Sequence, residues 1–337
     1  MIPILLESVN FDFFCHIPTG SLSNININID TRELIQDDED PSRPNGASNI
    51  FDNLIQARKK HPNKFISSYL NINSLRYKFC SIKELLSRNI VDMLIIAETK
   101  LDESFPDAQF RVNNYHLWRN DRNIHGGGLA VYLRSNLASD RKKNLECNKI
   151  ESICVELYVN NKKWLITGMY RPPSMSDSDF NQDFVKSYDQ MSVKYDNLLI
   201  LGDLNYDLLS DQKSTPLTNV CDICDLENIV KCATCFTKGA DPTLINVILT
   251  NRKSLLQNVM NFSCGLSDVH NLIAVQIKSN TPSLKNPYKT YRSYKQFNYE
   301  AFIQDLDNAK LDDQIINDNK DIHKTYETFE SSFLDML

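Results

Sequence analysis

The chain has 337 residues, of which 42% are apolar and 24% are charged, and its formal net charge at pH 7 is −6. These proportions are ordinary for a soluble globular protein, and the length suits one large domain with flanking segments. No stretch approaches the ~18 consecutive apolar residues of a transmembrane helix, so we expect no membrane anchor. The apolar start of the chain contains Glu7 and Asp12 and lacks a basic region, which argues against a signal peptide.

Residues 1–62 are expected to be largely disordered because they are rich in Asn, Asp, Ser and Pro, with one short helix predicted at Ile50–Lys60. An acidic net charge argues against a duplex-binding protein, which usually carries a basic footprint. The tract Asp30–Asp40, however, holds six acidic residues and one arginine and is expected to lie outside the fold. The whole-chain charge therefore does not describe the folded part.

The first two predicted strands end at polar side chains. Residues Ile66–Leu75 alternate in polarity and would place Asn71 and Asn73 on one face, since side chains two apart in a strand point the same way. The apolar run Val91–Ala97 has the continuous pattern of a buried strand and is followed directly by Glu98. Both strands are thus predicted to deliver polar groups to a site.

Two later strands end in the same way. Residues Lys163–Tyr170 run into Arg171 and two prolines, which must stop the strand because proline lacks an N–H. In Asn197–Asn205, four apolar residues stop at a glycine, and an extended chain would then present Asp203 and Asn205 on one face. The alternative is a β-turn, because Gly, Asp and Asn are common turn residues.

A final strand is predicted at Leu272–Ile277, just after Asp268 and His270. In chain order the strand ends therefore carry asparagine, glutamate, tyrosine, aspartate, asparagine, aspartate and histidine. Carboxylate and carboxamide oxygens suit Mg²⁺, and a histidine near carboxylates is the usual acid or base. The pattern predicts a metal-assisted hydrolase.

Helices are predicted at Lys78–Ser87, Asp177–Val193 and Pro216–Glu227. The last of these overlaps two CxxC pairs, which are separated by seven residues and consist of Cys221, Cys224, Cys232 and Cys235. This gap is tighter than the usual zinc-ribbon loop, and the segment fits an amphipathic helix whose cysteines join the core. We therefore favour core cysteines over a zinc site.

The motifs LNINSL, AETK, GGGLAVYLR, YRPP, LGDLN, LINVILTN and GLSDVHN follow one another over residues 65–277. In this order they resemble the endonuclease/exonuclease/phosphatase family, and within it the apurinic-type endonuclease domain of non-LTR retrotransposon polyproteins. The resemblance implies an α/β fold, a four-layer αββα sandwich of the DNase-like kind. We expect this domain at residues 63–278, a linker at 279–300, and a helical segment at 301–337 that starts a truncated downstream region.

The resemblance also implies a role for each matching residue. The implied catalytic residues are Tyr170, Asp203, Asn205, Asn246, Asp268 and His270, the implied phosphate or DNA contacts are Asn71, Asn73 and Arg171, and the implied metal ligands are Glu98, Asn71 and Asp268. The metal would be Mg²⁺, with Mn²⁺ as an alternative. Tyr170 would contact the scissile phosphate, Asp203 would hold or deprotonate the attacking water, and Asn205 would orient the phosphate.

Two positions depart from the family pattern. Asn246 stands where the family has an aspartate that orients the catalytic histidine. Val269 separates Asp268 from His270, and in an extended backbone a slip of one residue would turn the ring to the opposite face. A local bulge would restore the ring to the site.

Two functions therefore stay open. One is a Mg²⁺-dependent phosphodiesterase that nicks DNA for retrotransposon target-site priming, and the other is a catalytically inactive nucleic-acid-binding remnant of a truncated polyprotein. A small-molecule or lipid phosphatase on the same fold is the weaker third reading. The expected partner is DNA, a reverse-transcriptase-like Asp-Asp pair is absent from the sequence, and the resemblance implies an intracellular, nuclear location. The oligomeric state is not predicted.

Overall fold

The computed structural model describes residues 51–282 and 298–309. One sheet contains β1 (Lys64–Asn71), β2 (Met93–Ala97), β3 (Tyr115–Asn120), β4 (Leu129–Arg134), β11 (Leu256–Phe262) and β12 (Leu272–Asn280). The other contains β5 (Ser139–Arg141), β6 (Glu151–Val159), β7 (Lys162–Tyr170), β8 (Leu198–Asp203), β9 (Glu227–Asn228) and β10 (Asn246–Thr250). The helices are α2 (Asp52–Lys60), α3 (Phe79–Ser87), α4 (Asp177–Ser192), α5 (Asp211–Ile223) and α6 (Tyr299–Ala309), with short 3-10 turns at Asp107–Phe110, Lys143–Leu145 and Lys253–Leu255.

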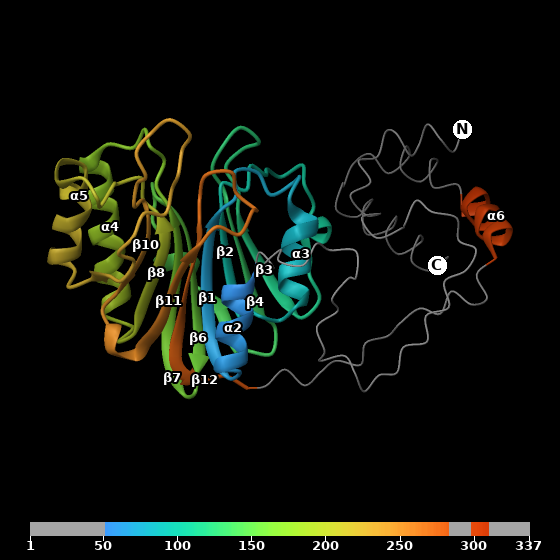
Figure 1. The fold of residues 1–337 in the computed structure, drawn as a ribbon, viewed down its shortest axis with the longest axis horizontal. Coiled ribbons are helices and arrows are strands. Elements are labelled where there is room, and N and C mark those ends of the chain that lie inside the picture. The colour runs from blue at the N-terminus through green and yellow to red at the C-terminus, as the bar shows by residue number, and fades with distance from the viewer. Residues whose placement is uncertain (1–50, 283–297, 310–337) are drawn as a thin grey trace.

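The two six-stranded sheets pack face to face between two layers of helices (Figure 1). Their strand orders are β11-β12-β1-β2-β4-β3 and β5-β6-β7-β8-β10-β9. Helices α2 and α3 cover the first sheet, and α4 and α5 cover the second. The four-layer αββα sandwich predicted from the sequence is confirmed.

Strand β1 shows how the sequence produces these layers. Phe65 and Tyr69 belong to the core that lies between the two sheets, whereas Ile66 and Leu70 belong to the core beneath α2 and α3. All four are fully buried. A strand buried on both faces needs no polar side, so its sequence is apolar or small from Phe65 to Leu70.

Each sheet has a parallel pair at its centre, and this positions the strand ends. Strand β1 runs parallel to β2, with α3 as the crossover, and β7 runs parallel to β8, with α4 as the crossover. Each of these four strands pairs in the antiparallel sense with its other neighbour in the sheet. Because strands in a parallel pair end at the same edge, the carboxyl ends of β1 and β2 meet, as do those of β7 and β8.

Two predicted elements differ from those observed. Strand β1 ends at Asn71 rather than Leu75, because Asn73 (φ 51°) and Ser74 (φ 90°) leave the extended region. Helix α5 starts before Pro216 and ends at Ile223, since Ser210 caps it by accepting the N–H of Lys213. Proline favours a first helical turn, which misplaced the predicted start.

Helix α2, which precedes the predicted domain start at residue 63, is anchored to the first sheet by a buried ionic group. Asp92 is fully buried and accepts hydrogen bonds from Arg58 of α2 at 2.6 Å and from the N–H of Ile66 at 2.7 Å. Its other oxygen accepts from Arg134, which is also buried. Helix α2 is therefore part of the domain.

The other end of the domain passes the predicted boundary at residue 278. The N–H of Thr281 donates to the carbonyl of Asn63 at 2.7 Å, and Arg134 donates to the carbonyl of Pro282 at 2.8 Å. Helix α6 begins two residues before the helical segment predicted at 301–337 and overlaps its start. The rest of that segment, residues 283–297 of the linker region and residues 1–50 lie outside the described residues. Within the described ranges no helix is long and apolar enough to cross a bilayer.

Candidate active site

Four polar side chains stand at the carboxyl ends of the central parallel strands. Asn71 ends β1, Glu98 follows β2, Tyr170 ends β7 and Asp203 ends β8. Two come from each sheet, so the site straddles the interface between the sheets. All four were named as site residues in the sequence analysis, either from the strand ends on which they stand or from the family resemblance.

Hydrogen bonds join these four side chains into one cluster. The amide Nδ2 of Asn71 lies 2.8 Å from Oε1 of Glu98 and 3.0 Å from Oδ2 of Asp203, so one amide links two carboxylates. The Tyr170 hydroxyl donates to Oε1 of Glu98 at 3.1 Å. The cluster is thus held together by its own hydrogen bonds.

Glu98 has a left-handed backbone (φ 53°), which is uncommon outside glycine. Neighbouring loops hold it there: the Ser74 N–H donates to the Glu98 carbonyl at 2.8 Å, and the Thr99 N–H donates to the Gly128 carbonyl at 3.2 Å. Such a conformation costs on the order of 1–3 kcal/mol, and residues held this way concentrate at functional sites. The strain is located at a predicted metal ligand.

Tyr69 forms a hydrogen bond with the backbone of Asp203 and was not among the residues predicted from the sequence. Its fully buried hydroxyl accepts the Asp203 N–H at 2.9 Å and donates to the Met169 carbonyl at 3.3 Å. Burial raises the pKa of Tyr69 well above its usual value, so the hydroxyl keeps its proton. The available signal was its position two residues before Asn71, on the same strand face.

Asp203 and His270 form the titratable pair of the site. Burial, with the charge of Glu98, raises the pKa of Asp203 to about 7, although hydrogen bonds from Asn71 and Asn205 oppose this. His270 Nδ1 lies 3.7 Å from Oδ2 of Asp203, and burial lowers the pKa of the imidazole. Near neutral pH the histidine is therefore mainly uncharged, beside a carboxyl group close to its titration point.

Val269 does not turn the histidine away, contrary to the one-residue slip expected for an extended backbone. Strand β12 starts only at Leu272, and the preceding loop bends so that the His270 N–H donates to the Ser267 hydroxyl at 3.2 Å. The Val269 carbonyl accepts from Phe236 at 2.8 Å. The extra residue is absorbed in this loop, and the ring reaches Asp203.

Asp268 lies outside the cluster. Its side chain is 82% exposed and lies 3.9 Å from the Lys78 ammonium group. Among the described residues it makes no contact with Glu98 or Asp203. The implied ligand set of Glu98, Asn71 and Asp268 is therefore not assembled as a group.

Asn205 follows a turn rather than an extended chain. Its backbone is left-handed (φ 53°), its N–H donates to Oδ1 of Asp203 at 3.1 Å, and its side-chain amide donates to the Arg171 carbonyl at 2.7 Å. This is an Asx-type turn. The turn reading left open by the sequence is the one observed, and it fixes the Asp203 carboxylate.

Two implied phosphate contacts lie away from the cluster. The Arg171 guanidinium is buried, 4.1 Å from the centre of the Tyr206 ring and 3.5 Å from Asp177. Asn73 is exposed and accepts a hydrogen bond from Lys100. Neither side chain contacts the site in the part of the chain that the structure describes.

Asn246 lies opposite Asp203 in the β8–β10 pairing and is fully buried. Its Nδ2 donates to the Asn271 carbonyl at 3.4 Å, and its Oδ1 has no hydrogen-bond partner among the described residues. The same holds for Nδ1 of His270. Oδ1 of Asn246 and Nδ1 of His270, two buried polar atoms beside Asp203, thus have no hydrogen-bond partner among the described residues. Asn246 is the position at which the family places an aspartate.

The donor set of the cluster fits a divalent cation bound by oxygen. Glu98 and Asp203 share one amide, and within the described residues neither forms an ion pair with lysine or arginine. Two uncompensated carboxylates plus a carboxamide are the hard ligands that Mg²⁺ and Mn²⁺ accept. No group of three His, Cys, Asp or Glu side chains arranged for a metal occurs in the described ranges.

The four CxxC cysteines separate into different environments. Cys221 belongs to α5 and Cys224 follows it as the C-cap, whereas Cys232 is exposed. Cys235 pairs through its backbone with His270 and Thr243. Burial raises the pKa of Cys221 to about 12 and that of Cys224 to about 11, which keeps these two as thiols.

Asp203 is expected to contribute a loss of stability to the metal-free protein as the pH rises from about 4 to about 7. An unfolded aspartate has a pKa of 3.8, and the folded Asp203 has a pKa of about 7, so the folded state binds the extra proton in this window. Raising the pH removes that proton, and the folded state loses the stability that the proton contributed. Urea unfolding in EDTA across this range should show the slope, and Asp203→Asn should reduce it. An unchanged slope in the variant would contradict the assignment.

Residues 69–265, more than half of the chain, match the Endonuclease/Exonuclease/phosphatase family, and the chain belongs to this family. The family resemblance drawn from the motifs is confirmed. No curated protein sequence matches the chain.

Three solved structures share the fold. The endonuclease domain of TRAS1, a telomere-specific non-LTR retrotransposon, is 12% identical with a TM-score of 0.54, covering 64% of this chain and 100% of that domain. The AP endonuclease LMAP from Leishmania major is 11% identical with a TM-score of 0.54, covering 66% and 89%. The 3′ phosphatase NExo from Neisseria, bound to product DNA hairpin, is 16% identical with a TM-score of 0.51, covering 63% and 99%. At these identities the likeness concerns the fold alone.

Proposed function

We propose that this protein is a divalent-metal-dependent phosphodiesterase that nicks DNA. The observation that carries the proposal is the cluster of Asn71, Glu98, Tyr170 and Asp203, built from both sheets, with His270 3.7 Å from Asp203. Membership of the Endonuclease/Exonuclease/phosphatase family supports a phosphoester hydrolase. The nucleases among the proteins of the same fold support DNA as the substrate.

The protonation state of each residue determines its role in the proposed reaction. Asp203, with a pKa of about 7, is the general base that takes a proton from the attacking water, because a base works best with a pKa near the working pH. Burial and the charge of Glu98 raise the pKa of the Tyr170 phenol, which therefore stays protonated and donates to the negative charge that develops on phosphate. His270 lies beside Asp203 and is a second group there that can bind a proton.

Glu98 and Asn71 would hold Mg²⁺, and the bound ion would supply charge stabilisation at the phosphoryl and leaving oxygens. Asp268 is left out of this ligand set because its side chain is 82% exposed. Asn205 acts by fixing Asp203 through its N–H, in addition to its implied role in orienting phosphate.

Conversion of supercoiled plasmid to the open circle tests the proposal. The wild type is expected to nick in Mg²⁺ or Mn²⁺ and not in EDTA. For target-site priming the nick must leave a 3′ hydroxyl, so a DNA polymerase should extend it without prior phosphatase treatment. A nick that resists extension would keep the nuclease and remove the priming role. A priming enzyme of this kind would act in the nucleus.

The second candidate is a DNA-binding remnant without catalysis, and one observation favours it. Asn246 cannot supply the carboxylate that would balance a protonated His270, and its Oδ1 is left unpaired. Folded protein that binds DNA and never nicks in either metal would make this candidate the better account.

Replacing Asn246 with aspartate is expected to raise the nicking rate by at least tenfold, toward the ~10²–10⁴-fold that a well-positioned acid or base contributes. The new carboxylate would stabilise the imidazolium and fix its tautomer. Single-turnover nicking rates measure the effect, with Asn246→Ala as the control that removes the amide and adds no charge. Equal rates in wild type and Asn246→Asp would show that His270 does not limit the reaction.

A further inference from the structure

We infer that Arg122 binds a phosphate of the substrate beside Tyr170, and that Glu151 and the glycine run 126–128 hold its guanidinium ready. This inference rests on the proposed function, since it adds a phosphate contact to the same site. Arg122 was not among the residues singled out from the sequence.

The guanidinium lies next to the ring that carries the proposed phosphate donor. The Arg122 Cζ atom is 5.8 Å from the centre of the Tyr170 ring, and the Tyr170 hydroxyl bonds to Glu98. The Arg122 side chain is 36% exposed, so a ligand can reach it. It therefore adjoins the cluster from the solvent side.

Two contacts fix the orientation of the guanidinium. Nη1 forms a 2.8 Å ion pair with Oε1 of Glu151, and Nε donates to the Gly126 carbonyl at 2.8 Å. The other Glu151 oxygen accepts the Gly128 N–H at 2.6 Å. Among the described residues Nη2 has no hydrogen-bond partner. An arginine held in this way loses little rotamer entropy when it binds phosphate.

The glycines are required by this arrangement. Gly127 has a left-handed backbone (φ 68°), and a Cβ there would lie 2.3 Å from the Arg122 Cζ and 2.5 Å from a Glu151 oxygen. Gly128 (φ 86°) would place a Cβ 2.4 Å from the Thr99 hydroxyl. Gly126 and Gly127 thus leave room for the arginine, and Gly128 leaves room for Thr99.

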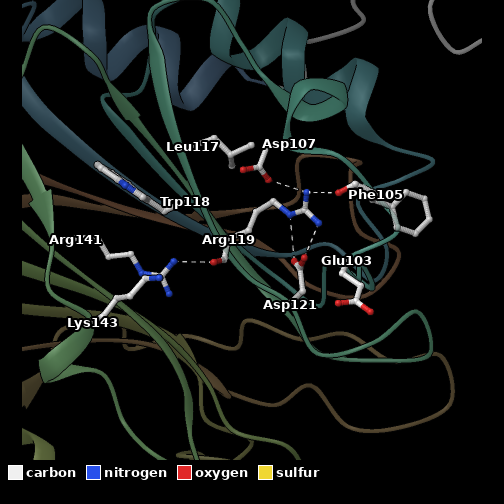
Figure 2. Close-up of a pocket in the computed structure, with 9 residues that line it drawn as sticks. All are labelled: Glu103, Phe105, Asp107, Leu117, Trp118, Arg119, Asp121, Arg141 and Lys143. Atoms are coloured by element: carbon white, nitrogen blue, oxygen red, sulfur yellow. Dashed lines mark hydrogen bonds and ion pairs between the residues drawn. The ribbon is translucent and has the colours of Figure 1, made fainter. Parts of the chain in front are cut away.

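The loop that carries Arg122 is also anchored at its start (Figure 2). Asp121 accepts from Arg119 of β3, with Nη2–Oδ2 2.5 Å and Nε–Oδ1 3.2 Å apart, inside a cleft of about 520 Å³ at the edges of β3 and β5. Arg119 also pairs with Asp107, and Arg141 pairs with Glu146. Arg119 is thus already used in holding the loop, and Arg141 is already paired with Glu146.

The negative charge of the site explains why a cation is needed there to bind phosphate. Glu98 and Asp203 would repel a phosphodiester, and Arg171, the arginine that the resemblance implied, is buried against Tyr206. A guanidinium offers a phosphate planar, paired N–H donors. Arg122 is the arginine in ring contact with Tyr170 within the described residues, so it is positioned to meet a phosphate oxygen there.

Salt-dependent DNA binding tests the contact without catalysis. The full chain is titrated with a fluorescent 20-base-pair duplex in EDTA over a range of NaCl concentrations. Arg122→Ala is expected to weaken binding and to make the slope of log K against log salt less negative by about 0.9, the value for one phosphate contact. Arg252→Ala is the matched control, because Arg252 is exposed beyond the far end of β10 and its removal takes away the same charge.

Nicking in Mg²⁺ supplies a second readout. Arg122→Ala should lower kcat by about 10²–10³-fold, as for loss of one preorganised donor, and Arg122→Lys should keep the salt slope but recover only part of kcat. A lowered melting temperature with wild-type slope and kcat would show a purely structural latch and overturn the inference. If wild type does not nick but Arg122→Ala alone shifts the slope, the proposed function fails and the phosphate contact stands.

Discussion

Replacing Asp203 with asparagine is expected to reduce metal-dependent nicking by about 10²–10⁴-fold, the contribution of a positioned general base. Asparagine keeps the shape of the side chain, but its amide has no pKa near 7 and cannot take a proton from water. Asp203 is the residue on which the cluster converges, since it contacts Asn71, the N–H of Asn205 and His270. The measurement is the single-turnover rate on supercoiled plasmid.

Stability separates a chemical effect from misfolding in this variant. Burial penalises the charged form of Asp203, so above about pH 7 the neutral asparagine should leave the metal-free protein at least as stable as the wild type. Asp222→Asn, on the exposed face of α5, is the control and should keep full activity. A wild-type rate in Asp203→Asn would remove Asp203 as the base.

Replacing Asp92 with alanine is expected to lower the free energy of unfolding by about 3–5 kcal/mol, because it leaves a buried arginine without its counter-charge. Arg134 is 3% exposed, and the N–H of Ile66 would also lose its acceptor. Domains have only about 5–15 kcal/mol in total, so this change threatens the fold itself. Urea unfolding followed by circular dichroism measures it.

Two further variants make the Asp92 prediction specific. Asp140→Ala removes an exposed carboxylate that lies 2.7 Å from Lys142 and should change stability little, since exposed ion pairs contribute little. Replacing both buried partners, Asp92→Leu with Arg134→Met, should recover much of the loss, because no unpaired charge is then left behind. A double variant as unstable as Asp92→Ala would show that the charge is not the cause.

The site residues that the structure brings together are those whose position follows from local pattern. Asn71, Glu98, Tyr170 and Asp203 each stand at or just after the end of a buried strand, and parallel pairing brings such ends together. Helix α4 was also predicted closely, because Ser176 caps it through its side chain. In these cases the neighbouring residues alone determine the outcome.

The residues that were placed differently depend on contacts and turns that their strand pattern does not encode. Arg171 was expected at phosphate, but Tyr206 and Asp177 hold its side chain in the interior. Asn73 leaves the strand through a left-handed turn that its own residue type does not require. No local pattern in the sequence encodes either contact.

The roles of His270, Arg122 and Tyr69 are tertiary in the same way. His270 reaches Asp203 because an irregular loop absorbs Val269, and periodicity says nothing about irregular backbone. Arg122 depends on Glu151, and Tyr69 depends on Asp203 across the sheet interface. Tyr69 and Arg122 had no motif of their own, which is why only the three-dimensional arrangement reveals them.

The division of the cluster between two sheets has a consequence for how the protein folds. The amide of Asn71 and the carboxylate of Asp203 are 132 positions apart in sequence, and they meet only when both sheets are docked. Contacts this distant close late, since a long loop must be ordered before they form. Secondary structure can therefore recover during refolding while the active site is still in two halves, and the return of catalytic competence marks the moment when the sandwich closes.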